Sequence, residues 1–138
     1  MKRILLLLGL ILAVEIVIGG VGTGVLNAQQ EGVRRTELLK ADLAIMGGKE
    51  ANLVLVEFEP GATIAKHFHP GDELVYILEG SVIVEVEGEA SIALKAGDTF
   101  HQPPKQAHSG QNASTTDPVR LLVIWIVEKG QPLTVPVK

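Results

Sequence analysis

The sequence predicts an all-β domain, a sandwich or a barrel, preceded by a short apolar segment. From residue 51 onward, apolar and polar residues alternate in several short runs, which places alternate side chains on opposite faces of a strand. Gly, Pro and Asp turns such as Pro60-Gly61 separate these runs. Residues 29–138 carry no convincing long helical period, so helices are not expected to build the core.

Five runs stand out as strands, in chain order. They span residues 51–59, 73–79, 81–87, 91–94 and 119–127. Gly80 breaks the second run from the third, and Gly88 turns the chain so that the fourth run can pair back on the third. The last run is apolar nearly throughout, so we expect it to be buried on both of its faces.

Length, charge and cysteine content limit the class of protein. A chain of 138 residues suits one domain. Its net charge is −4 and it shows no basic patch or nucleic-acid signature, which argues against nucleic-acid partners. It has no cysteine, which excludes disulfides, thiolate metal sites and thiol catalysis. Histidine, aspartate and glutamate remain as the strong metal ligands.

The N-terminus has the pattern of an export signal. Two basic residues precede the apolar run Ile4–Val14, which is too short to span a bilayer but matches the core of a signal peptide. Cleavage after Ala28 would make the protein periplasmic or secreted. If Glu15 is tolerated within the apolar run, the segment could instead remain as a membrane anchor, with the domain outside the cytoplasm.

These observations divide the chain into four parts. They are a signal peptide or membrane-anchor helix at 1–28, an N-terminal arm at 29–50, a barrel at 51–130 and a C-terminal tail at 131–138. Arg34-Arg35 in the arm is interpreted as part of a solvated arm or an edge strand rather than a binding patch.

Three histidines and one glutamate form the candidate metal site. His67 and His69 are two residues apart, so on a strand their imidazoles share one face. Glu73 begins an apolar strand, where a carboxylate without a partner would be costly and a cation would be a natural partner. His108 can close the site from a neighbouring strand. On spacing alone, the pattern could equally be chance among surface or core histidines.

The donor set indicates which metal would bind. Three neutral imidazoles and one carboxylate suit Mn, Fe, Co, Ni, Cu or Zn and disfavour Ca and Mg, which prefer oxygen ligands. An octahedral ion with four protein ligands keeps two positions for water, dioxygen or a chelating substrate. Export favours Mn, Zn or Cu over ferrous iron.

Two longer patterns contain these four residues. The first is Gly61, His67, His69, Glu73 and Gly80, and the second is Gly97, Pro103, His108 and Asn112. In residue type and spacing they resemble the two motifs of the cupin superfamily, and together they span about half of residues 29–138. Lys105 departs from the second motif, which usually has glycine at that position. If Lys105 must adopt a positive φ, the strain is about 1–2 kcal/mol.

The resemblance to single-domain cupins implies a six-stranded β-barrel or jelly-roll core, the cupin-type double-stranded β-helix. It implies that His67, His69, Glu73 and His108 bind one divalent transition metal inside the barrel, with Mn, Zn, Fe, Ni or Cu as candidates. It also implies a homodimer, since dimers are common among such proteins. Trp125 and Tyr76 are expected in the core or at a dimer interface.

Three functions remain open on the sequence. The first is a metal-dependent enzyme with dioxygenase, isomerase or decarboxylase chemistry on a small organic molecule. The second is a non-catalytic module that binds a metal or small ligand, which the scarcity of acid–base groups beyond the ligands favours. The third is an empty barrel used for assembly. His101 is a candidate base or substrate contact behind the ligands, or else an outward-facing surface residue.

Overall fold

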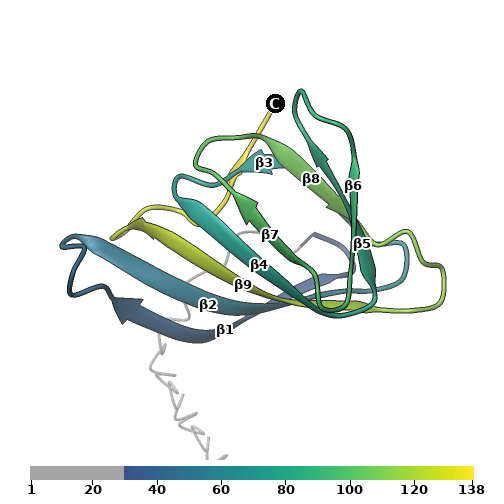
Figure 1. Cartoon of the computed structure of the whole chain (residues 1–138), viewed down its shortest axis with the longest axis horizontal. Coiled ribbons are helices and arrows are strands. Elements are labelled where there is room, and N and C mark those ends of the chain that lie inside the picture. The colour runs from purple at the N-terminus through teal and green to yellow at the C-terminus, as the bar shows by residue number, and fades with distance from the viewer. Residues whose placement is uncertain (1–29) are drawn as a thin grey trace, which may run out of the picture.

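The structure, a computed structural model, describes residues 30–138, which form two facing β-sheets (Figure 1). In spatial order the first sheet contains β1 (Val33–Asp42), β2 (Lys49–Phe58), β9 (Val119–Glu128), β4 (Asp72–Glu79) and β7 (Thr99–Gln102). The second contains β10 (Val135–Pro136), β3 (Thr63–Phe68), β8 (His108–Gln111), β5 (Ser81–Val86) and β6 (Ile92–Lys95). All neighbours pair antiparallel, and no helix occurs within these residues. The all-β fold is therefore confirmed, with two five-stranded sheets in place of the expected six-stranded core.

The core lies between the two sheets and is built from the alternation seen in the sequence. Along β2 every second residue is buried, and the same holds for β5. The buried apolar residues of both sheets form one cluster: Val33, Val54, Val56, Phe58, Ala62, Ile77, Val82, Val84, Val86, Leu94, Val119, Leu121, Val123, Trp125 and Val127. Branched aliphatic side chains thus supply most of the core, as the low aromatic content requires.

Strand β9 differs from the expectation of burial on both faces. Its inward residues, such as Val123 and Trp125, are buried, whereas Leu122, Ile124 and Ile126 on the outer face are only partly buried. Within residues 30–138 no further layer covers the outer face of the first sheet. The run is therefore apolar because β9 is a central strand of the first sheet, although its outer face is not covered by another layer of the described residues.

The expected arm and tail both take part in the sheets. Strand β1 pairs with β2 from Val33 to Asp42, so the range 29–50 contains an edge strand of the first sheet. This agrees with the edge-strand interpretation of Arg34-Arg35. In the range 131–138, β10 pairs with β3 through Val135 and Pro136.

The predicted signal or anchor segment at 1–28, with its cleavage site after Ala28, lies outside the described residues. Across residues 30–138, no helix is long and apolar enough to cross a membrane.

Lys105 adopts the left-handed conformation that the second motif usually assigns to glycine. Its φ is 66°, and it is the one non-glycine residue of the described chain with a positive φ. In this conformation the Lys105 N–H donates a hydrogen bond to the His69 carbonyl at 2.8 Å. This hydrogen bond therefore links the segment before His108 to the segment that carries His69. The link requires a strained backbone conformation at Lys105.

Replacing Lys105 with glycine should stabilise the protein. Relief of about 1–2 kcal/mol of strain exceeds the roughly 0.5–1 kcal/mol that the greater freedom of glycine in the unfolded chain costs. We expect Lys105→Gly to raise the free energy of unfolding by up to about 1 kcal/mol in urea titrations, and Lys105→Ala to leave it within about 0.5 kcal/mol. A loss of stability in Lys105→Gly would show that the turn is not strained.

Candidate metal centre

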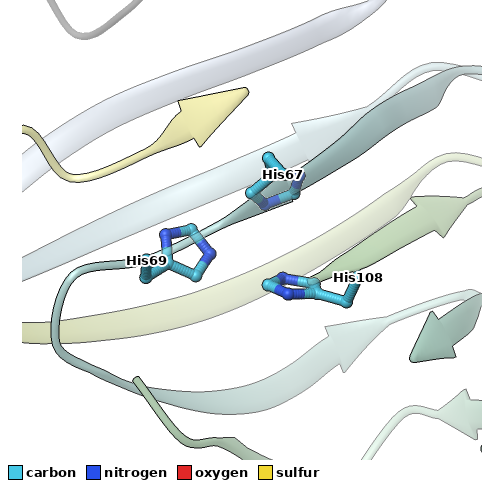
Figure 2. Close-up of side chains that lie close together, drawn as sticks. All are labelled: His67, His69 and His108. Carbon is cyan, nitrogen blue, oxygen red and sulfur yellow. The ribbon is translucent and has the colours of Figure 1, made fainter. Parts of the chain in front are cut away.

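Four buried side chains from both sheets meet inside the sandwich, and Figure 2 shows the three histidines among them. His67 lies on β3 opposite His108 on β8, His69 follows β3, and Glu73 lies on β4 in the other sheet. The three histidines offer ligand atoms within 4.8 Å of one another. Glu73 Oε2 lies 3.4 Å from His69 Nε2 and 3.3 Å from His108 Nε2. The structure thus brings together all four residues of the predicted ligand set.

Backbone carbonyls orient all three imidazoles. His67 Nδ1 lies 2.8 Å from the Ala65 carbonyl oxygen, and His69 Nδ1 lies 2.5 Å from that of Leu133. His108 Nδ1 lies 3.2 Å from the carbonyl oxygen of Gln106. A carbonyl oxygen only accepts, so each Nδ1 carries the proton and each neutral ring keeps its lone pair on Nε2. This tautomer is the one that a metal-binding histidine needs.

The arrangement fits a divalent transition metal. His69 Nε2 is buried and has no hydrogen-bond partner within the described part of the chain. A buried polar atom without a partner is costly unless something else binds it. Three imidazole nitrogens and one carboxylate oxygen form a donor set typical of first-row transition metals. The buried His67, His69 and His108 therefore fit a metal site of the kind found in cupins.

Burial and neighbouring groups set the charges of the site. Burial lowers the pKa of His67 to about 4, with the nearby His108 and His69 adding to the effect, so its ring is neutral at neutral pH. Burial alone would raise the pKa of Glu73, but its interactions with His108 and His69 outweigh burial and hold that pKa below its ordinary value. A neutral His67 ring and an ionised Glu73 carboxylate are the protonation states in which these two groups bind metal.

Acidification should therefore weaken the metal-free protein. Below pH 6.5 the unfolded chain protonates His67, while the folded ring stays neutral until about pH 4, so stability falls as pH falls through this window. From pH 7 to pH 5 this group alone removes about 2 kcal/mol. Urea unfolding of chelator-treated protein at pH 7, 6 and 5 measures the loss, and His67→Gln should reduce it. Equal pH slopes for the parent and His67→Gln would contradict the assignment.

His101 lies away from the metal centre. It is exposed, and its Nε2 lies 2.8 Å from Asp72 Oδ1. On β7 it sits opposite Leu74, an exposed residue of β4, while its neighbour Gln102 is buried. This geometry fits the outward-facing alternative rather than a base behind the ligands.

Two cavities that share several lining residues lie beside the ligands. An inner chamber of about 60 Å³ is lined by His67, Glu73 and His108 together with apolar core residues. An outer groove of about 780 Å³ runs from His67 toward residues 130–137. Arg35 and Trp125 line both spaces, together with His67. The chamber has room for a metal and a few small ligand atoms, so an organic molecule bound there must lie mostly in the groove.

Sequence reasoning assigned neither Arg35 nor Asn52 to this site. Arg34 is exposed and pairs with Glu57, whereas Arg35 turns inward beside the ligands. The alternation of the strand could have predicted the position of Arg35. Val33 and Arg35 lie on the same face of a strand, and the apolar Val33 indicates that this face points inward. Asn52 shares the inward face of β2 with Val54 by the same rule.

Comparison with known proteins agrees with the fold. The family described as Cupin domain matches residues 54–125, more than half of the chain. A 3-hydroxyanthranilate 3,4-dioxygenase from Xanthomonas euvesicatoria is 34% identical over 45% of this chain and 37% of its own length. An oxalate-binding protein from Thermotoga maritima is 30% identical over 59% of this chain and 68% of its own.

A solved structure extends the comparison to three dimensions. A cupin-like protein from Thermotoga maritima is 26% identical, covers 67% of each chain and superposes with a TM-score of 0.56. The chain spans little more than a third of the length of the dioxygenase it matches. The match to the family nevertheless includes all four ligand candidates, His67, His69 and Glu73 of the first motif and His108 of the second. The chain belongs to the cupin family.

Proposed function

We propose that this protein is an exported cupin that holds one divalent transition metal through His67, His69, Glu73 and His108 and uses it to bind and transform a small organic molecule. The observation that supports this most directly is the buried set of three imidazoles, whose ligand nitrogens lie within 4.8 Å of one another beside a groove. The metal identity remains among Mn, Zn, Fe, Ni and Cu.

The roles of the chain's own residues follow from their positions. A bound metal would act as a Lewis acid on an oxygen of the substrate. The three histidines and Glu73 would hold that metal, with the backbone carbonyls of Ala65, Leu133 and Gln106 fixing the ring orientations. The apolar chamber walls exclude water from the inner side of the site. The groove admits and orients the organic part of the substrate.

The proposed reaction class is dioxygenase-, isomerase- or decarboxylase-like. One of the relatives is named a dioxygenase, which supports oxygen chemistry as the first class to test. The second candidate function is a non-catalytic module that binds a small ligand or the metal itself. The exposed position of His101 favours it, because no histidine besides the ligands lines either cavity.

The test begins with the metal content of protein purified without chelators or a His-tag. About one equivalent of a single transition metal supports the proposed centre. The metal-loaded protein is then incubated with enediol, flavonol, diketone and uronate substrates while dioxygen and substrate consumption are followed. Turnover supports the enzyme, whereas ligand binding without turnover supports the binding module. A protein that takes up no metal after reconstitution contradicts both metal-dependent functions.

We also propose a homodimer formed through the outer face of the first sheet. That face carries Leu74, Tyr76 and the partly buried Leu122 and Ile124 on adjacent strands. Opposite charges flank it, with Arg120 beside both Glu57 and Glu79, so a second copy related by a two-fold axis can offer complementary groups. Sedimentation equilibrium should give a dimer for the parent and a monomer for Tyr76→Glu. A monomeric parent would contradict the dimer.

A further inference from the structure

The groove beside the metal ligands contains hydrogen-bond donors that have no partner within residues 30–138. Asn52 on β2 and Trp125 on β9 are direct partners in the sheet, and both side chains face inward. They are 2% and 3% exposed, yet Asn52 Nδ2 and Trp125 Nε1 make no hydrogen bond. Two neighbouring buried donors left without hydrogen bonds destabilise the protein, and a ligand that supplies an acceptor would remove that cost.

Arg35 adds a positive charge to the same wall. It lines both the inner chamber and the groove, together with His67 and Trp125. No carboxylate of the described residues lies within ion-pair distance of its guanidinium group. Burial lowers the pKa of Arg35, and the attraction of Glu73 only partly offsets that effect. The guanidinium therefore belongs to a partly buried cation that lacks full compensation.

The other charged groups of the groove already have partners or lie in solvent. Lys40 Nζ lies 3.0 Å from Glu50 Oε1, and Lys66 Nζ lies 2.5 Å from Glu87 Oε1. Glu37 is exposed. Arg35 is thus the groove cation left for a ligand. The neighbouring carboxylates of Glu37 and Glu50 disfavour a ligand with several negative charges.

We propose that the organic ligand is a small monocarboxylic acid, whose carboxylate is held by Arg35 with Asn52 Nδ2 and Trp125 Nε1 as further donors while another oxygen reaches the metal. This deepens the proposed function and rests on it, because it names the ligand class of the same site. A planar guanidinium matches a carboxylate with two parallel hydrogen bonds. The groove of about 780 Å³ holds the remainder of such a molecule.

Isothermal titration of the metal-loaded full chain with benzoate, salicylate and pyruvate tests this proposal, with benzamide and salicylamide as neutral counterparts. We expect at least one carboxylate to bind at least ten-fold more tightly than neutral ligands of the same shape. Arg35→Gln should lower its affinity at least ten-fold, because the charge-assisted hydrogen bonds are lost. Asn52→Leu and Trp125→Phe should each lower it about three- to ten-fold.

Arg34→Gln is the matched control for the key variant. Arg34 is the adjacent arginine of β1, and it pairs with Glu57 instead of entering the groove. Its replacement should change carboxylate affinity less than two-fold. Metal content is measured in every variant and should stay near one equivalent in Arg35→Gln. That readout separates loss of the carboxylate site from loss of the metal centre.

Each result decides between the proposals. The carboxylate site is overturned if Arg35→Gln leaves carboxylate affinity unchanged, or if the parent binds acids and amides equally well. In either case, about one equivalent of bound metal would leave the proposed function intact. If the parent takes up no metal, the proposed function fails. The carboxylate site at Arg35 is then tested by benzoate binding to the metal-free protein. The affinity for benzoate should still fall in Arg35→Gln and stay unchanged in Arg34→Gln. Inorganic phosphate binding with the same dependence on Arg35 and no carboxylate binding would overturn the ligand class.

Discussion

Replacing His67 and His108 together with alanine is expected to abolish metal binding. The two residues face each other on β3 and β8, and their ring centroids lie 4.4 Å apart. Losing partners that merely orient a ligand weakens metal affinity about 10–100-fold, so removing two ligands themselves should weaken it by at least about 100-fold. Elemental analysis of purified protein should give about one equivalent for the parent and a trace for the double variant.

His101→Ala provides the matched control for this experiment. It removes the fourth histidine of the chain, which lies exposed beside Asp72 and away from the ligands. The metal content of this variant should equal that of the parent, and both variants should keep the β-sheet circular dichroism spectrum. Retention of metal by the double variant, or its loss from His101→Ala, would mean that the ligand assignment is wrong.

Local alternation explains why much of the site was readable in the sequence. His67 and His69 belong to a two-residue pattern, and Glu73 begins the next apolar run, so each face follows from the strand period. The structure adds that His108 stands directly opposite His67. The resemblance to the two motifs predicted that His108 joins the other ligands, which spacing alone does not, but it did not predict which residue lies opposite His108.

The order of the strands, and the residues that β1, β2 and β9 contribute to the site, could not be predicted from the sequence. Alternation tells which face a residue occupies, but not which strand lies beside it or what covers the face. Strand β9 lies between β2 and β4, far from both in the sequence, and this order places Trp125 beside Asn52. Arg35 lines the same chamber as the ligands because β1 is the edge strand of the first sheet, next to β2. These contacts depend on pairing between distant segments.

Replacing Gly71 with alanine should strongly destabilise the protein. Gly71 lies in the short loop between His69 and Glu73, packed against β9. A Cβ there would lie 1.8 Å from the Ile126 carbonyl oxygen and 2.8 Å from its carbonyl carbon. Both atoms belong to the backbone of a central strand, so neither can move aside cheaply. We expect the free energy of unfolding to fall by about 3 kcal/mol or more, measured by urea titration of the metal-free protein.

Gly47→Ala separates this clash from the general effect of adding a methyl group. Nothing lies within 4 Å of the position that its Cβ would take, so stability should change by less than about 0.5 kcal/mol. Gly71→Ala should also weaken metal binding, because the loop must shift and its ends carry His69 and Glu73 to the centre. The stabilisation that added metal gives, measured as the change in unfolding midpoint, should therefore be smaller in Gly71→Ala than in Gly47→Ala. Equal stability of the two variants would show that the loop does not pack against β9 as described, and that the geometry joining His69 to Glu73 is set elsewhere.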